Sequence, residues 1–502
     1  MNRRMPGRSG FYRSVAMRLA AAASLLIALP PVLSTAAEAI SDQAVVHLLN
    51  RLAFGPTLGE VRQVKTVGVE RYIAQQLDPD SLPEPIELRW RLAQLDTLKF
   101  DPMQLRRLYG PPRVLRGFKP NPELEKAQRE RVRIILRDAS EARMLRAVLS
   151  TRQLHEVMVD FWFNHFNVFS GKGLDDVWIG NYEQQAIRPF VLGRFRDLLF
   201  AATKHPAMLV YLDNALSTAP ESPGARGGKK GLNENFAREV MELHTLGVNG
   251  GYTQDDIVTL ARALTGWGVN SPDARLFPEY AAVFEGARHD YRPKVFLGHP
   301  LRSRGKAEGE EALDILARSP ATARHIAFKL AQYFVADEPP PPLVERLAAR
   351  FLETDGNIRE VLRTLFASSE FWNSRSEKYK TPYQFVISAV RAAAVPIGNI
   401  RPLLGAMDQL GMPLYGCLTP DGYKNTEDAW LGPDATTQRI GFATALARGT
   451  IKLTGAAQPV DAARLEATFG STLSDATRAA IDGAPPGLRA ALILGSPDFM
   501  RR

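Results

Sequence analysis

The chain has 502 residues, of which 45% are apolar and 23% are charged. This length predicts two to four packed units, and the composition is typical of a folded protein and argues against disorder. The net charge of +9 is modest for the length and gives no indication of nucleic-acid binding. Cys417 is the only cysteine, so an intramolecular disulfide and a multi-cysteine metal site are excluded. Its side chain is either a small hydrophobe or a reactive thiol.

The first 39 residues have the pattern of a signal peptide. Five arginines precede the short apolar run 19–29, and the small-x-small sequence Ala37-Glu38-Ala39 follows it. The run is too short to span a bilayer comfortably, although an uncleaved membrane anchor is the alternative. We expect cleavage after Ala39, which takes the net charge from +9 to +5 because five arginines and Glu38 are removed. The mature chain is then periplasmic or secreted, with no integral membrane span.

Helical periodicity dominates the chain from residue 45 onward. It predicts a helix over residues 45–52 and a pair of short helices over 58–77, with Gly68 marking the break. Prolines in the stretch 82–120 predict loops at both of its ends, with room for one helix between Pro85 and Pro102.

Residues 122–169 are predicted to form one long helix or two stacked ones. Their first half carries interleaved charges of both signs, which is typical of a solvated helix face. Their second half becomes aromatic at residues 161–169, which indicates burial. Further helices are expected over 182–192, 195–203 and 206–212.

A flexible loop, residues 217–232, is expected to lead into a helix at 233–247 and a partner helix behind it. The partner helix has a capping box, because the Thr253 hydroxyl and the Asp256 carboxylate are three residues apart at its start. The stretch 269–301 breaks the helical pattern and is expected to hold short strands and turns.

Helices resume at residue 309, and residues 404–439 are predicted to be irregular and to fold over a neighbouring surface. The fold class that results is an all-α, multi-helical globular bundle with a short irregular or β insertion at 269–301. The expected organisation is a signal peptide (1–39), a main helical domain (40–455) and closing helices (456–502).

The helix at 233–247 concentrates polar chemistry. At about 100° per residue, Glu239 and Glu242 lie on one flank of its apolar face and His244 lies on the other flank. The helix therefore cannot supply a Glu-x-x-His metal pair by itself. It can offer Glu239 and Glu242 to a site completed by other segments. The alternative is a set of salt bridges, with Arg238, that dock neighbouring helices.

Two other segments contain histidines of interest. His165 lies among aromatic residues, where a buried imidazole needs a hydrogen-bond partner. His289 and Asp290 are adjacent, with Lys294 close by, and such a pair can serve a general base or a metal ligand. In both cases a purely structural hydrogen bond is the alternative. The chain contains no P-loop, convincing dinucleotide fingerprint, zinc-protease motif or nucleophile elbow.

Several segments share the pattern of one family. They are 49–56 (LNRLAFGP), 161–166, 196–199 with 206–214, 233–267, His289-Asp290, 322–330, 380–382 and 420–423. Together they resemble the large bacterial family called domain of unknown function eighteen-hundred, over nearly all of the mature chain. The resemblance implies an exported, helical protein of no agreed activity, with an exported partner protein. Members often carry a histidine where this chain has Phe163, so a two-histidine metal site does not carry over here.

Two functions fit these patterns. The first is an exported enzyme, assisted by a divalent metal ion, in which carboxylates bind metal or act as a base and a histidine ligates or carries protons. Its predicted catalytic residues are Glu239, Glu242, His289 and Asp290, and its predicted metal ligands are His165, Glu239, Glu242 and His244. The alternative is a non-catalytic envelope or secretion factor that binds a partner protein through an exposed apolar patch near residues 404–430. Trp and Tyr in the irregular segments suggest a third function, cell-wall binding.

Overall fold

The computed structural model describes residues 40–111, 121–227, 231–270, 281–455 and 458–502. The predicted signal peptide lies outside these residues, and Ser41–Arg502 form one compact unit. The all-α prediction is confirmed, since helices dominate and the described strands form two small sheets. None of the helices in the described part of the chain has the length and apolar character needed to cross a membrane.

The first helices follow the sequence pattern closely. Gly68, at φ +91°, separates α2 from α3 as predicted. The loop expected after Pro102 is wrong, because these residues form α5. Pro102 occupies the first helical position, where its missing N–H is not needed, and Asp101 caps the helix in a capping box with Gln104. The helices of this region are α1 (Asp42–Leu52), α2 (Glu60–Val67), α3 (Val69–Leu77), α4 (Ile86–Ala93) and α5 (Pro102–Tyr109).

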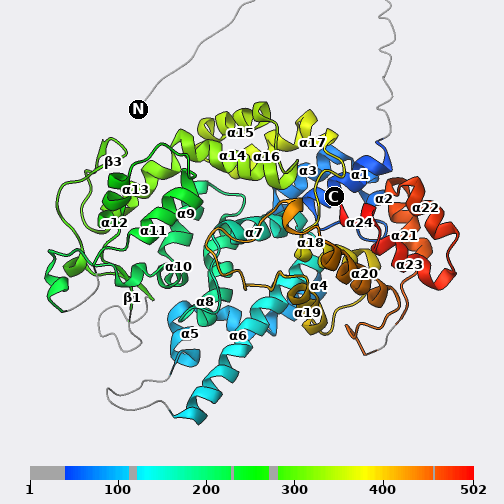
Figure 1. The fold of residues 1–502 in the computed structure, drawn as a ribbon, viewed down its shortest axis with the longest axis horizontal. Helices are drawn as coiled ribbons and strands as arrows, with labels where there is room; N and C mark the ends of the chain where they lie inside the picture. Colours follow the sequence, from blue (N-terminus) through cyan, green and yellow to red (C-terminus); the bar gives the residue numbers. More distant parts are fainter. Residues whose placement is uncertain (1–39, 112–120, 228–230, 271–280, 456–457) are drawn as a thin grey trace, which may run out of the picture. The chain divides into compact units, whose positions relative to one another are not determined.

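The predicted stretch 122–169 forms two helices, α6 (Pro122–Leu149) and α7 (Gln153–His165). Figure 1 shows α7 in the middle of the compact unit, between the group α14–α16 and the helix α6. The next helix, α8 (Asp175–Tyr182), continues into the π-helix Glu183–Ile187 and a 3-10 turn.

Several of the remaining helices pack against the next helix in the chain, for example α11 on α12, α14 on α15 and α15 on α16, whereas others pack across the sequence, such as α20 on α23. The first of them are α9 (Phe195–Lys204), α10 (Pro206–Tyr211), α11 (Glu234–Glu239), α12 (Gln254–Ala263), α13 (Lys306–Ala317), α14 (Pro320–Phe334) and α15 (Pro341–Glu353). The rest are α16 (Ile358–Phe366), α17 (Ser369–Asn373), α18 (Pro382–Ala393), α19 (Arg401–Gln409), α20 (Pro433–Ala447), α21 (Ala462–Phe469), α22 (Asp475–Asp482), α23 (Pro486–Leu494) and α24 (Pro497–Met500).

The stretch 269–301 contains the short strands that its composition predicts. β1 (Trp267–Val269) pairs antiparallel with β2 (Ala282–Phe284), and β3 (Val295–Phe296) pairs antiparallel with β4 (His299–Pro300). Residues 271–280 lie outside the described part. In the expected loop 217–232, residues Pro223–Gly227 form a 3-10 turn, and 228–230 are not described.

The expectation that all of 404–439 is irregular is wrong at both ends, which belong to α19 and α20. Pro433 occupies the first turn of α20, where a proline is favourable. Only the 410–432 segment lacks α-helix, and it does fold over a neighbouring surface, as described below.

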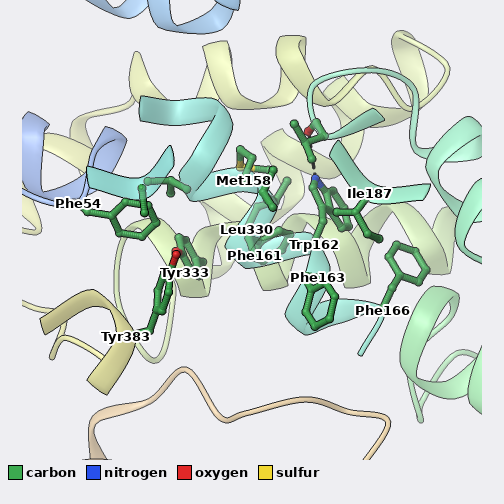
Figure 2. Close-up of a cluster of buried hydrophobic side chains, with 14 of the residues drawn as sticks. Phe54, Met158, Phe161, Trp162, Phe163, Phe166, Ile187, Leu330, Tyr333 and Tyr383 are labelled. Atoms are coloured by element: carbon green, nitrogen blue, oxygen red, sulfur yellow. Dashed lines mark hydrogen bonds between the residues drawn. The ribbon is translucent and has the colours of Figure 1, made fainter. Parts of the chain in front are cut away.

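The core centres on α7, which is buried on nearly all sides. Figure 2 shows its aromatic side chains Phe161, Trp162 and Phe163 together with Leu330 and Tyr333 of α14. Burial of each large apolar side chain contributes about 1.5–3 kcal/mol. The end of α7 is therefore held rigidly, and the polar residues that follow Phe163 have fixed positions.

Candidate functional site

Asn164 and Asn167, at the end of α7, hold the 410–432 segment in place. The Asn164 side chain donates to the Tyr423 carbonyl and accepts from the Tyr423 N–H, both at 2.8 Å. The Asn167 amide donates to the carbonyls of Cys417 (3.1 Å) and Thr419 (2.8 Å). These contacts join parts of the chain that are about 250 residues apart, so the two asparagines fix where the segment lies.

Gly422 makes the close approach to Asn164 possible. Its φ is +71°, in the left-handed region, and a Cβ at this position would overlap the Asn164 carbonyl and side chain. Only glycine meets both conditions without strain. The sequence Pro420-Asp-Gly-Tyr423 is thus a turn shaped to dock on the end of α7.

A cavity of about 290 Å³ lies between α7, α14 and the 410–432 segment. It is lined by apolar side chains such as Phe161 and Phe328 and by several polar groups. A small apolar pocket with a few convergent polar groups is the usual form of a ligand site. The polar residues that line this cavity include Asn164, His165, Lys329, Asp421 and Lys424.

Lys329 lies on the face of α14 that contacts α7. His325, Lys329 and Tyr333 are spaced four residues apart, so they share one helix face. The two outer members contact α7, with ring centroids 6.2 Å apart for His325–His165 and 5.3 Å apart for Tyr333–Phe161. Lys329 is bracketed between these contacts and therefore faces the cavity beside His165.

Within the described residues, Lys329 makes no hydrogen bond and no ion pair. Burial lowers the pKa of its amine, and the positive charge of Lys424 lowers it further, while Asp421 opposes the shift. Asp421 cannot fully compensate, because its carboxylate pairs with Lys424 at 2.7 Å. A half-buried amine whose nearby carboxylate is already paired with another lysine shifts toward its neutral form, which makes Lys329 the chemically available group of the cavity.

A π-helix, Val240–Thr245, follows α11 and supplies acceptors to the histidines. The Thr245 hydroxyl donates to the Val240 carbonyl at 2.7 Å, five residues back. His165 bonds the His244 carbonyl through Nε2 at 3.1 Å, and His325 bonds the Leu243 carbonyl at 3.3 Å. Single π-helical turns are frequent at functional sites.

His165 is neutral and has one nitrogen available. Its Nε2 carries the proton, since the partner is a carbonyl oxygen, and Nδ1 is left with a free lone pair. Nδ1 has no hydrogen-bond partner among the described residues. It keeps some exposed surface, in contrast to the unpartnered Nε2 atom of His244, which is completely buried. Burial, Lys329 and His244 together hold the pKa of His165 well below its ordinary value. The neutral ring can therefore accept a hydrogen bond at Nδ1 from a group in the cavity.

Asp160 connects the cavity to a buried ion network. Its carboxylate accepts from Arg143 at 2.8 Å and from the Tyr333 hydroxyl at 3.2 Å. Arg143 also bonds Glu183 at 3.2 Å, and Glu183 bonds Arg188 at 3.1 Å. Burial raises the pKa of Asp160 despite these partners. The network fixes the wall of the cavity behind Tyr333.

Of the residues that the sequence singles out, His165 and His244 come together, with ring centroids 6.0 Å apart. Glu242 instead pairs with Arg238 at 3.3 Å, as the salt-bridge alternative supposed. Glu239 is half-buried, and burial followed by the charges of Glu242 and Asp421 raises the pKa of its carboxyl. Glu239 does not line the cavity, whereas Asp421 does.

His289 and Asp290 belong to a different network. His289 Nδ1 donates to the Thr265 carbonyl at 2.9 Å, and Nε2 contacts Glu308 at 3.0 Å. Lys294 also donates to Glu308, at 2.8 Å. Burial would raise the pKa of Asp290, but hydrogen bonds, chiefly from Arg292 and Arg262, hold it below its ordinary value. These contacts agree with the structural alternative, and the catalytic role stays a prediction.

Two of the predicted metal ligands, His165 and Glu242, make contacts with other groups of the chain. Among the described residues, no three His, Cys, Asp or Glu side chains are arranged to hold a metal ion. The Nε2 atom of His165 is used by a carbonyl, and Glu242 is used by Arg238. Metal binding stays a prediction that elemental analysis tests.

The sequence patterns do not mark His325 and Lys329 of α14 as residues of a site. Lys329 appears among them only as part of the family segment 322–330. The spacing His325-x3-Lys329-x3-Tyr333 is the signal that marks them as one helix face. Cys417 is buried, and burial raises the pKa of its thiol, which favours the small hydrophobe over the reactive thiol.

The fold and the cavity define a largely helical protein with a small polar site, and the 410–432 segment, which contains no α-helix, covers this site. A family model described as "Protein of unknown function (DUF1800)" matches residues 47–501. The chain belongs to this family, as the sequence resemblance predicts. No curated protein and no solved structure matches it.

Proposed function

We propose that the chain is an exported enzyme whose active site is the cavity between α7, α14 and the 410–432 segment. Export is supported by the basic, apolar and small-x-small pattern of residues 1–39. The activity is supported chiefly by one observation, the unpaired amine of Lys329 beside the free Nδ1 of His165. Perturbed titratable groups in a pocket are typical of functional sites.

The contacts of each cavity residue support a separate role in the reaction. Lys329 is the group that binds or attacks the substrate, and His165 accepts and returns a proton through Nδ1. Asn164 positions the 410–432 segment over the substrate, and the Arg143–Asp160 pair keeps the Tyr333 side of the cavity rigid. The substrate is small and polar, because the cavity measures about 290 Å³ and combines apolar walls with several donors.

Fragment screening on the purified mature protein tests this assignment. Small carbonyl, carboxylate and amide fragments should bind in the cavity, and Lys329→Met should weaken them about tenfold or more, since a polar contact is worth roughly 1–3 kcal/mol. The matched control is Lys204→Met, which removes a lysine paired with Glu310 at 2.7 Å outside the cavity. Fragments that bind only elsewhere, or equally well to both variants, would contradict the assignment.

The partner-binding alternative has the support of two exposed leucines. Leu418 is 69% exposed and Leu431 is 52% exposed, both in the 410–432 segment, near where the sequence predicts an apolar patch. Such side chains favour contact with another protein. The same screen separates the two functions, because a partner-binding factor needs no ligand in the cavity.

A further inference from the structure

Resting on the proposed function, we infer that Lys329 is a covalent nucleophile and that the substrate is a small aldehyde or ketone held as an imine. Lys329 lies on α14 between the His325–His165 and Tyr333–Phe161 contacts, and its side chain lines the cavity.

The surroundings suit a nucleophile better than an anion clamp. A lysine that binds an anion is charged, whereas Lys329 is partly desolvated and has no hydrogen bond or ion pair among the described residues. Desolvation and a neighbouring cation are the two established ways to activate a lysine amine. Lys424 is that cation, and its charge lowers the pKa of Lys329, while Asp421, which pairs with Lys424 at 2.7 Å, opposes the shift.

The proton transfers of imine formation need one group, and His165 meets the requirement. The amine lone pair attacks the carbonyl carbon, a C–N bond forms, and the C=O π electrons move to oxygen. The nitrogen loses a first proton to His165 Nδ1, and the imidazolium returns it to the alkoxide, which becomes the hydroxyl of a carbinolamine. A second proton follows the same route from the nitrogen to this hydroxyl, which leaves as water while the C=N bond forms. The ring ends neutral, as it began, and no oxidant or reductant is consumed.

The experiment traps this imine in the full mature chain. Acetaldehyde and cyanoborohydride are added at neutral pH, where an ordinary lysine of pKa about 10.4 has on the order of one amine in 10³ unprotonated. Peptide mapping should find N-ethylation first at Lys329. Lys380 provides an internal comparison, because burial also lowers its pKa well below the ordinary value, but it lies in a separate cavity of about 160 Å³ and packs over Phe499.

Two variants sharpen the result. Lys329→Arg should remove the label while keeping a cationic side chain, and His165→Gln should slow labelling about 10²-fold, as expected for loss of a general acid–base. Labelling at Lys380 or at exposed lysines before Lys329 overturns the inference. If cavity fragments bind but Lys329 is not labelled, the imine is wrong and the proposed site survives. If neither occurs, both fail.

Discussion

Replacement of Arg143 by methionine is expected to lower the free energy of unfolding by about 3–5 kcal/mol, because it leaves the buried carboxylate of Asp160 without its cation. Arg143 is 5% exposed at its side chain and bonds Asp160 and Glu183. Its guanidinium also lies near the rings of Phe163 and Tyr383, at 4.9 and 5.2 Å from their centroids. Chemical denaturation of the two proteins measures the difference.

The matched control lies on the same helix. Arg133 pairs with Glu130 at 2.6 Å, but its side chain is 71% exposed, so Arg133→Met should change stability by no more than about 1 kcal/mol. Adding Asp160→Asn to Arg143→Met should recover part of the loss, since both charges are then removed. If Arg143→Met is no more harmful than Arg133→Met, the buried network does not stabilise the cavity wall.

Gly422→Ala is expected to detach the 410–432 segment from α7. Alanine at a left-handed φ costs about 1–2 kcal/mol, and the overlap with Asn164 removes two hydrogen bonds worth about 0.5–1.5 kcal/mol each. The expected total is therefore about 2–5 kcal/mol. Hydrogen exchange of the Tyr423 amide, which donates to Asn164, should become much faster.

Gly411→Ala separates the strain from the overlap. Gly411 has φ +81°, close to the value at Gly422, but a Cβ there meets nothing within 4 Å. The Gly411→Ala variant should lose only the conformational contribution to the free energy of unfolding, about 1–2 kcal/mol. Hydrogen exchange of the Tyr423 amide should be unchanged. Equal effects of the two substitutions on exchange would show that Asn164 does not hold the segment.

Local chemistry made much of the fold predictable. The break at Gly68, the capping box at Thr253 and the short strands after Trp267 follow from residues near one another in the chain. α5 was missed because Pro102 indicates a loop unless the Asp101 cap is noticed. The π-helix was missed because a 3.6-residue period was assumed through residues 240–245.

The site was much less predictable, because its contacts cross long separations in the chain. The sequence singles out His165 and His244, but Lys329, which lines the same cavity as His165, is more than 160 positions away in the chain. Asn164 meets Tyr423 across 259 positions. No periodicity reports such contacts, and they decide which of the polar residues share one environment.

Measurement of the Lys329 pKa decides whether this amine is activated in the folded protein. Competitive labelling with trace acetic anhydride over a range of pH gives the apparent pKa of each lysine by mass spectrometry. We expect the pKa of Lys329 to lie below that of the exposed lysines in the same sample, and Lys424→Gln to raise it, because Lys424 contributes to the lowering.

The lowered pKa of Lys329 also makes the free energy of unfolding depend on pH. Between the folded pKa and the unfolded value of about 10.4, the unfolded lysine binds more protons, so the free energy of unfolding rises with pH. Lys329→Met should lack this component. A Lys329 amine that titrates together with the exposed lysines would contradict the account, because it would then be an ordinary charged side chain rather than the available group of the cavity.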